Sequence, residues 1–383
     1  MDQGSSGRSR REFFSKVGAA GAGAFNIVRP ESVRGSQANS KVTFGLIGCG
    51  GRGTFDASIV AKDERAQFTV LCDKFEDRTD NAKSRLGASG AAIYKDYEKA
   101  LASDVDAVII ATPPFLHPPM LEAAVQAKKH VYCEKPMGVD YEGCKRVIKA
   151  GRSADPKKNV SVGFQQRYGP VYLEAYKRMK DGEIGELVNA RAFWIGQDPF
   201  QRKPYDDPKV EKLRNWFCYK DYSGDFIVEQ DCHNFDVLHW FVGLPTRVVG
   251  YGGRKVRTSM DLLDHLTLAF EFPNGIHVNF EANQMSPPGF GRVGEEFTGT
   301  KGVLLTSRAS MTHIKGPNAE DRETMKSEGD ITVDAFKAFI TRIKDGEVEN
   351  VAERSARSTM IAILGRTALY TNKEVTWKGL YGA

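Results

Sequence analysis

The chain has 383 residues, of which 41% are hydrophobic, and this is enough for two domains with cores of their own. Its formal net charge of +5 comes partly from a basic segment in the first 40 residues, so neither a nucleic-acid partner nor an anionic membrane surface is indicated. No apolar run approaches the ~20 residues of a membrane-spanning helix, so no stable membrane span is expected in the mature protein.

The start of the chain carries the three parts of a secretory signal. A basic stretch contains Arg10 and Arg11, a weakly apolar middle covers Val17–Val28, and small residues precede Asn39. The paired arginines resemble a twin-arginine signal. We therefore predict a signal peptide over residues 1–38, recognition by the twin-arginine export machinery, and a periplasmic or exported protein that is membrane-tethered if the signal stays on. The alternative is a basic tail that happens to contain Arg-Arg.

From Lys41 onward, apolar strands alternate with amphipathic helical stretches, which predicts an α/β Rossmann domain over residues 39–160. The strand "KVTFGLI" runs into "GCGGRG", which satisfies G-x-G-x-x-G between a strand and a helix. The first glycine allows the tight turn, the second lets the backbone approach a pyrophosphate, and the third lets helix and strand pack closely. The predicted cofactor-binding residues in this loop are Gly48, Gly50, Gly51, Arg52 and Gly53.

The second strand, "QFTVLCD", ends at Asp73, which lies 25 residues after Gly48. A carboxylate at this place accepts hydrogen bonds from the adenosine ribose hydroxyls and repels a 2′-phosphate. The cofactor is therefore predicted to be NAD, with NADP less favoured. Lys74 and Arg78 lie close enough to blur that preference, and Arg78 is included among the cofactor-binding residues.

Two further strands end in polar turns. The buried strand Val105–Ala111 is followed by "TPPFLH", and a helix then leads to the strand "HVYCEKP". Because ligands of such sheets lie at the carboxyl ends of the strands, both turns should face one crevice. His117 could equally cap the helix that it begins. The residues predicted to contact the cofactor here are Thr112, Pro113, His117, Glu134 and Lys135.

After "NVSVGFQQRYGP" the alternation of strands and helices stops, and longer strand patterns follow. We place the domain boundary near residues 159–167 and predict an α+β domain over residues 161–383 with an open, mostly antiparallel sheet. The strand patterns cover residues 187–196, 246–256 and 263–284, the last turning at "PNG", and helical patterns cover residues 334–344 and 353–371.

The segment "SGDFIVEQDCHNFDVLHWFVG" concentrates reactive side chains. On one continuous helix, Glu229, His233, Asp236 and Trp240 would share a face, and such a polar stripe is typical of a cleft rather than of a core. One alternative is a polar helix at a domain interface. Another is a zinc site that includes Cys232, but no further ligand cluster follows, so no metal is expected.

Donors and aromatic rings that precede this segment in the chain suit a polyhydroxylated ligand, although any single one of them could be solvated surface. The predicted substrate-binding residues are Gln165, Arg167, Tyr168, Arg214, Trp216 and His233. The six cysteines form no C-x-x-C pair, and we interpret them as small buried hydrophobes rather than as disulfides.

In combination, the glycine loop, the Asp73 strand end, the Thr112-Pro113-Pro114 turn, Glu134-Lys135-Pro136 and Glu229-x-x-x-His233-x-x-Asp236 resemble the glucose–fructose oxidoreductase/inositol dehydrogenase/MocA (Gfo/Idh/MocA) superfamily over about residues 41–375. In that superfamily, the lysine of E-K-P and a histidine of the second domain face the nicotinamide and the reacting sugar carbon. The resemblance thus implies catalytic roles for Lys135 and His233, and it also implies a homo-oligomer. Where the superfamily usually has Asp, this chain has Glu229, a longer carboxylate.

The resemblance implies that Lys135 stabilises a developing alkoxide and that His233 accepts the hydroxyl proton, with Glu229 or Asp236 orienting its ring. The predicted function is a periplasmic NAD(P)-dependent oxidoreductase of a secondary hydroxyl on a sugar or glycoside. Because no fresh NAD is supplied outside the cytoplasm, the cofactor would be tightly held and recycled in place. The alternatives are a redox-neutral NAD-dependent glycosidase, net oxidation to a 3-keto-sugar, and a non-catalytic sugar-binding protein.

Overall fold

The computed structural model describes residues 41–382. The predicted signal peptide, residues 1–38, lies outside the described residues, as do residues 39, 40 and 383. Between Lys41 and Gly382, no helix combines the length and the apolar character needed to cross a bilayer. All six cysteines are buried and free, which confirms that they act as small hydrophobes.

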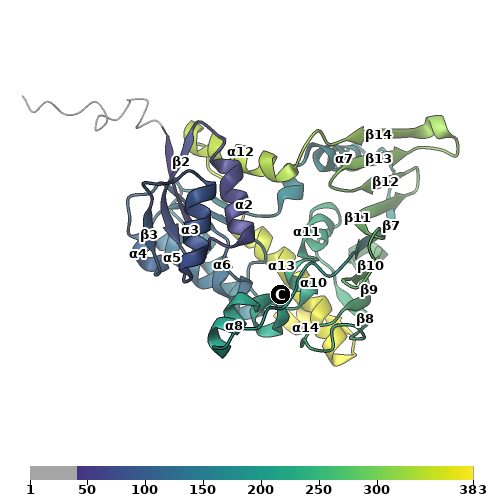
Figure 1. Ribbon diagram of the computed structural model, residues 1–383. Coiled ribbons are helices and arrows are strands. Elements are labelled where there is room, and N and C mark those ends of the chain that lie inside the picture. Colours follow the sequence, from purple (N-terminus) through teal and green to yellow (C-terminus); the bar gives the residue numbers. More distant parts are fainter. Residues whose placement is uncertain (1–40, 383) are drawn as a thin grey trace, which may run out of the picture. The chain divides into compact units, whose positions relative to one another are not determined.

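The first sheet contains six strands, all paired in parallel, in the order β3-β2-β1-β4-β5-β6. It lies on the left of the view in Figure 1, where β2 and β3 are labelled. This is the strand order of the dinucleotide-binding Rossmann fold, which confirms the predicted α/β class. β4 is buried along its whole length because helices cover both faces of the sheet, which explains its uninterrupted apolar sequence. The strands are β1 (Val42–Ile47), β2 (Ala66–Cys72), β3 (Ala92–Tyr94), β4 (Ala107–Ile110), β5 (His130–Cys133) and β6 (Val160–Val162).

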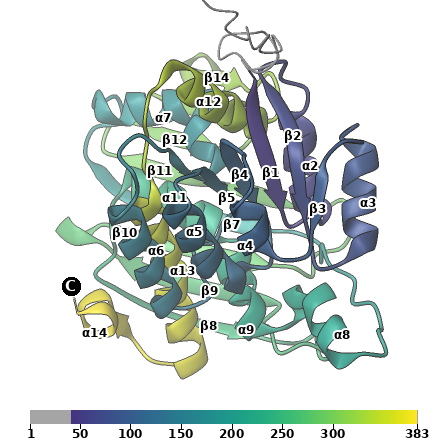
Figure 2. The same cartoon turned by 90° about the vertical axis from the view of Figure 1, so that its left-hand side faces the viewer.

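A helix from the far end of the chain helps to cover this sheet. Phe336 and Phe339 of α12 (Ile331–Asp345) pack on Tyr132, whose ring centroid lies 4.2 Å from that of Phe336. Figure 1 shows α12 beside α2 and Figure 2 shows it next to β1, so residues far beyond the predicted boundary complete the first domain. The other helices on this sheet are α2 (Gly51–Val60), α3 (Glu76–Arg85), α4 (Tyr97–Leu101), α5 (His117–Gln126) and α6 (Tyr141–Arg152).

The second sheet has nine strands in the order β14-β13-β12-β11-β7-β10-β9-β8-β15. Among the described strands of this sheet, only β7 and β10 pair in parallel, so the predicted open, mostly antiparallel sheet is confirmed. β9 and β10 form the predicted hairpin, with Asn274 at φ 65° in its turn. The strands are β7 (Leu187–Ile195), β8 (Arg247–Gly253), β9 (His265–Glu271), β10 (His277–Asn283), β11 (Arg292–Gly299), β12 (Val303–Thr306), β13 (Ser310–Ile314), β14 (Arg322–Lys326) and β15 (Val375–Thr376).

Helices pack on one face of the second sheet through aromatic side chains. Phe235 of α11 lies between Phe270 and Phe280, with ring centroids 5.5 and 4.6 Å away, and α13 is buried over most of its length. The helices of this part are α7 (Pro170–Lys180), α8 (Pro208–Arg214), α9 (Lys220–Ser223), α10 (Phe226–Glu229), α11 (Cys232–Phe241), α13 (Ala352–Thr371) and α14 (Trp377–Tyr381).

The predicted continuous helix through Glu229 and His233 is wrong, because α10 ends at Glu229 and α11 begins at Cys232. At the junction, the Asp231 amide donates to the carbonyl of Phe226, five residues back instead of four. One extra residue in a turn rotates the following helix by about 100°. Glu229 and His233 therefore do not share a helix face.

Candidate active site

The glycine loop has the geometry of a phosphate cradle. Gly48 has φ 94°, and a Cβ there would lie 2.6 Å from the backbone of Ala111 in the turn after β4. A Cβ on Gly53 would lie 1.9 Å from the carbonyl oxygen of Gly48, so both positions require glycine. A Cβ on Gly51, by contrast, would meet nothing within 4 Å in the described chain, and this open backbone forms the start of α2. A helix N-terminus with free space in front of it suits a pyrophosphate.

Asp73 holds this loop from the end of β2. Its Oδ2 accepts a hydrogen bond of 2.8 Å from the amide of Cys49, and its Oδ1 accepts one of 2.9 Å from the amide of Phe75. The carboxylate also lines the cavity, where its remaining lone pairs suit ribose hydroxyls and its charge disfavours a 2′-phosphate. The position of Asp73 therefore fits NAD.

A cavity of about 630 Å³ extends from the glycine loop to the helices of the second domain, a size typical of small-molecule sites. All the predicted cofactor-binding residues except Gly53 line it. Among the predicted substrate-binding residues, Gln165, Arg214, Trp216 and His233 line the cavity, whereas Arg167 and Tyr168 do not. The chain thus brings most of the predicted site together.

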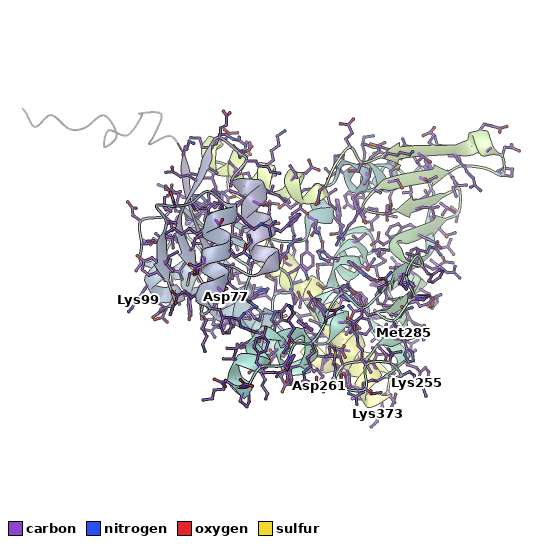
Figure 3. All side chains as sticks on the ribbon, in the orientation of Figure 1. Asp77, Lys99, Lys255, Asp261, Met285 and Lys373 are labelled. Carbon is purple, nitrogen blue, oxygen red and sulfur yellow. The ribbon has the colours of Figure 1, made fainter. Side chains whose placement is uncertain are left out.

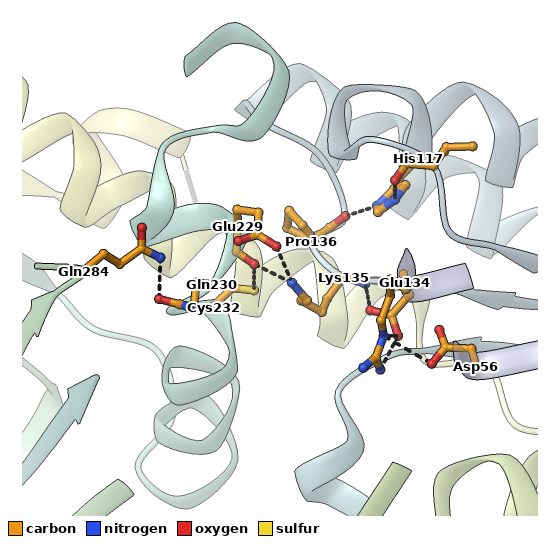
Figure 4. A network of polar contacts seen from close by, with 11 residues as sticks. Asp56, His117, Glu134, Lys135, Pro136, Glu229, Gln230, Cys232 and Gln284 are labelled. Carbon is orange, nitrogen blue, oxygen red and sulfur yellow. Dashed lines mark hydrogen bonds and ion pairs between the residues drawn. The ribbon is translucent and has the colours of Figure 1, made fainter. Parts of the chain in front are cut away.

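Lys135 reaches across from the first domain to the second (Figure 4). Its Nζ donates to the backbone carbonyl of Glu229 at 2.6 Å and to Oε1 of the same residue at 2.9 Å. The two side chains are only 12% and 13% exposed. Burial is the largest single influence and lowers the pKa of Lys135, but the negative charge of Glu229, the hydrogen bond to Glu229 and the nearby Glu134 together outweigh burial and leave the pKa raised. Lys135 is therefore an ammonium ion at neutral pH.

Beside Lys135 lies a second charge cluster. Glu134 accepts from Nε and Nη2 of Arg52 at 3.1 and 2.9 Å, and Nε of Arg52 also lies 3.2 Å from Asp56. Burial raises the pKa of Asp56 well above its usual value, and the neighbouring Glu134 adds to this effect. Burial acts against the charge of Glu134 too, but Arg52 and Lys135 outweigh it and lower its pKa. Arg52 is thus paired with Glu134, whose charged form these cations favour, whereas burial beside Glu134 favours the protonated form of Asp56.

The imidazole of His233 lines the cavity. Burial lowers its pKa well below the usual range, and the positive charges of Arg308, Lys135 and Arg52 add to the shift. The ring stacks on Trp194 at 5.9 Å and meets Phe164 edge-on at 5.9 Å. Its Nδ1 is buried and has no hydrogen-bond partner among residues 41–382. Because His233 also lines the cavity, its neutral imidazole is able to accept a proton from a ligand there.

The prediction that Glu229 or Asp236 orients His233 is wrong. Glu229 pairs with Lys135 because the break between α10 and α11 turns it toward the first domain. Asp236 accepts from Arg167 at 2.8 and 2.9 Å and from the hydroxyl of Ser358 at 2.7 Å. The imidazole is therefore held by aromatic packing instead of by a carboxylate.

Three other predicted contacts need correction. Arg167 is committed to Asp236, and the Tyr168 hydroxyl donates to Glu349 at 3.0 Å, so both stabilise the fold away from the cavity. Arg214 lines the cavity beside Phe75 and Asp77, next to the predicted ribose site at Asp73, and not beside His233.

The position of Arg214 follows from its partners. Arg214 is the last residue of α8. It pairs with Asp77 of α3, which is labelled in Figure 3, at 2.5 and 2.9 Å. Its guanidinium lies 4.0 Å from the centroid of the Phe75 ring. Phe75 follows Asp73 closely in the chain, so this ion pair connects the two domains next to the predicted ribose site.

His117 lines the cavity, but both of its ring nitrogens contact backbone carbonyls. Nδ1 lies 2.7 Å from the oxygen of Pro136 and Nε2 lies 2.8 Å from that of Thr112. Burial lowers its pKa, the two carbonyl contacts act in the opposite direction, and the ring links the turns that follow β4 and β5. His117 therefore positions both turns.

Two residues that were not predicted, Trp194 and Arg308, line the cavity with His233. Trp194 belongs to β7 and Arg308 to the turn after β12, and the alternating strand pattern of β7 could have marked only the tryptophan. For the zinc alternative, the part of the chain from Lys41 to Gly382 contains no cluster of three His, Cys, Asp or Glu side chains arranged to hold a metal ion.

Comparisons with known proteins identify relatives over most of the chain. Inositol 2-dehydrogenase from Corynebacterium glutamicum is 26% identical over 327 residues, which cover 83% of this chain and 87% of that protein. Myo-inositol 2-dehydrogenase from Thermotoga maritima is 24% identical over 337 residues, which cover 85% of this chain and 94% of that protein.

Solved structures share the fold. Levoglucosan dehydrogenase in complex with NADH and levoglucosan has a TM-score of 0.74 at 19% identity, covering 88% of this chain and 99% of its own. Scyllo-inositol dehydrogenase from Lactobacillus casei, with bound NAD(H) and scyllo-inositol, has a TM-score of 0.69 at 22% identity, covering 88% and 99%.

Two sequence models of one family match consecutive parts of the chain. The oxidoreductase family model with the NAD-binding Rossmann fold matches residues 42–164, and the GFO/IDH/MocA C-terminal domain matches residues 172–305. The cavity lies where these two parts meet, with Lys135 in the first and His233 in the second. The chain therefore belongs to the Gfo/Idh/MocA oxidoreductase family, and its first domain is the NAD-binding domain of that family.

Proposed function

We propose that the protein is an NAD-dependent dehydrogenase that oxidises a secondary hydroxyl of a sugar or polyol. The observation that carries this proposal is the pairing of an ammonium ion, Lys135, and a neutral imidazole, His233, in one cavity that begins at a glycine phosphate cradle. The relatives named inositol dehydrogenase support the choice of a polyhydroxylated substrate.

NAD fits the first half of the cavity, because Gly50, Gly51 and Asp73 present an open backbone and a carboxylate there. When bound, NAD supplies the nicotinamide that accepts a hydride. The protein's own residues handle the proton. Lys135 has three N–H donors, of which two go to Glu229, so the third is left for the substrate oxygen.

Donation from Lys135 stabilises negative charge on the substrate oxygen while His233 accepts the hydroxyl proton. The roles are separate because Glu229 keeps Lys135 charged, whereas burial and nearby cations keep His233 neutral. A charged acid and a neutral base thus coexist at the same pH in one cavity.

The test compares Lys135→Met and His233→Ala with the unchanged protein. Turnover, followed as NADH absorbance with a panel of polyols and sugars, should fall by roughly 10²–10⁴-fold in each variant. The rise in melting temperature on adding NADH should persist, since the glycine cradle is intact. Lys145→Met is the matched control, because Lys145 is an exposed lysine on α6 paired with Glu142. Full turnover in either site variant contradicts the assignment.

We also propose that the protein is exported through the twin-arginine route with its cofactor held tightly and recycled in place. The support is the arrangement of Arg10, Arg11 and the weakly apolar stretch after them. Residues 1–38 fused to a folded reporter should direct it out of the cytoplasm, and Arg10→Lys with Arg11→Lys should abolish export. Native mass spectrometry of the protein as isolated should show a bound dinucleotide, and its absence would contradict tight retention.

A further inference from the structure

Arg308 is a cation in the cavity that the mechanism above does not use. It follows β12, and its guanidinium lies 5.2 Å from the ring centroid of Trp194, the same indole that stacks on His233. Its Nε is out of contact with solvent and lacks a hydrogen-bond partner within residues 41–382. Across the same described part of the chain, no carboxylate forms an ion pair with it. A guanidinium stays charged at any physiological pH, so this charge is uncompensated.

The other cations that act on His233 are both paired. Arg52 has Glu134 at 2.9 Å, and Lys135 has Glu229 at 2.9 Å. These two pairs cancel, which leaves the charge of Arg308 as the net charge of this end of the cavity.

The acidic groups near Arg308 do not serve as its counter-ion. Glu295 accepts hydrogen bonds from Asn234 at 2.7 Å and from Thr306 at 2.6 Å, and burial raises its pKa to about 7. Asp330 caps α12 by accepting from the amide of Thr332 at 2.8 Å. Both carboxyl groups therefore have other partners, and one of them is partly protonated at neutral pH.

A buried charge without a counter-ion destabilises the folded protein, and such a charge is typical of a site where a ligand supplies the opposite charge. We propose that the substrate is a sugar or polyol bearing a carboxylate, such as a uronate or aldonate, and that Arg308 binds this carboxylate beside His233. The inference rests on the proposed function, because it names the substrate class of the same site. One uncompensated positive charge matches a carboxylate better than a phosphate, which brings close to two negative charges.

The test uses three matched compounds: a neutral hexose, the corresponding hexuronate, and the methyl ester of that uronate. With NAD and the whole protein, kcat/KM should be about 10- to 100-fold higher for the uronate than for either neutral compound, the range expected for a charge-assisted hydrogen bond. Arg308→Gln should remove this preference, and Arg308→Lys should retain part of it. NADH affinity, measured by fluorescence, should change less than 3-fold in both variants.

Arg292→Gln is the control variant. Arg292 also lies over an aromatic ring of β7, that of Phe193 at 3.9 Å, but it pairs with Glu296 and does not line the cavity. This variant should keep the preference for the uronate. Melting temperatures should show Arg308→Gln to be at least as stable as the unchanged protein without ligand, since no ion pair is lost and an uncompensated buried charge is removed.

Three results would overturn the inference: equal kcat/KM for the uronate and its ester, a preference for a sugar phosphate added to the panel, or a loss of NADH affinity in Arg308→Gln that tracks the loss of turnover. The last would assign Arg308 to the cofactor pyrophosphate. Calorimetric binding of the uronate to the NADH-loaded Lys135→Met protein keeps the two proposals separable. If no compound is oxidised but the uronate binds there through Arg308, the dehydrogenase proposal fails and the carboxylate site stands.

Discussion

The ion pair between Lys135 and Glu229 leads to a quantitative prediction about pH. The change Glu229→Gln keeps the size of the side chain and an oxygen that accepts from Nζ, but it removes the negative charge 2.9 Å away. That charge is the largest influence raising the pKa of Lys135, and burial, which lowers the pKa, would then dominate. An opposite charge this close shifts a pKa by about 1–3 units, or ~1.4–4 kcal/mol. The pKa of Lys135 should fall by that amount, to below its ordinary value.

The assay is kcat/KM for NAD reduction as a function of pH, because this ratio reports groups of the free enzyme. In the unchanged protein, activity should persist beyond about pH 10, since Lys135 stays charged. In Glu229→Gln, the alkaline decline should move down by about 1–3 pH units as Lys135 loses its proton. Glu122→Gln, which removes an ion pair with Arg146 outside the cavity, should leave the profile in place. An unmoved or upward-shifted decline in Glu229→Gln would refute the reasoning.

Three further changes test other parts of the structure. Gly48→Ala should abolish NADH binding in fluorescence titrations, because its Cβ would lie 2.6 Å from backbone atoms of Ala111. Asp73→Ser should weaken NAD binding by about 10- to 100-fold while NADP binding changes less. The preference for NAD over NADP, measured as the ratio of their dissociation constants, should therefore decrease. Burial raises the pKa of Glu295 from 4.5 to about 7 in the folded protein. Between these pH values the folded protein keeps a proton that the unfolded chain releases, so the free energy of unfolding should decrease as the pH rises from 4.5 to 7. Glu295→Gln should therefore gain about 3 kcal/mol at about pH 8 in urea unfolding, with no gain near about pH 4.

The first domain was predictable from sequence because its signals are local. A glycine loop, a carboxylate at a strand end and the buried strand Val105–Ala111 each depend on neighbours in the chain, and parallel pairing then gathers the strand ends at one edge. The antiparallel hairpin of β9 and β10 was predictable for the same reason, since alternation and the turn lie within one segment.

Strands β11 to β14 were not predicted. β12, β13 and β14 have only four or five residues each, although β11 has eight. β14, at the edge of the sheet, is exposed along its whole length, so it has no buried face to impose an apolar alternation. Arg308 lies in a turn of this same region and was missed with it.

The partners of the polar residues were harder to predict than their presence in the site. A single amide that bonds five residues back, at Asp231, decides that Glu229 faces Lys135 and not His233. Helical periodicity assumes a constant number of residues per turn, so a periodicity argument does not detect one extra residue in a turn. Similarly, Arg167 and Asp236 are 69 residues apart, and their pairing depends on tertiary packing.

The return of α12 onto the first sheet means that the dinucleotide-binding half is not a separable unit. Phe336 and Phe339 shield Tyr132 and Phe44, so a fragment ending near residue 162 would expose an aromatic surface that its own sequence has no means to cover. Grafting this half onto a relative would require residues 331–345 to travel with it. In any hinge motion about the cavity, α12 must likewise move together with the dinucleotide-binding domain. The two parts that move are therefore defined by which elements pack together and not by their order along the chain.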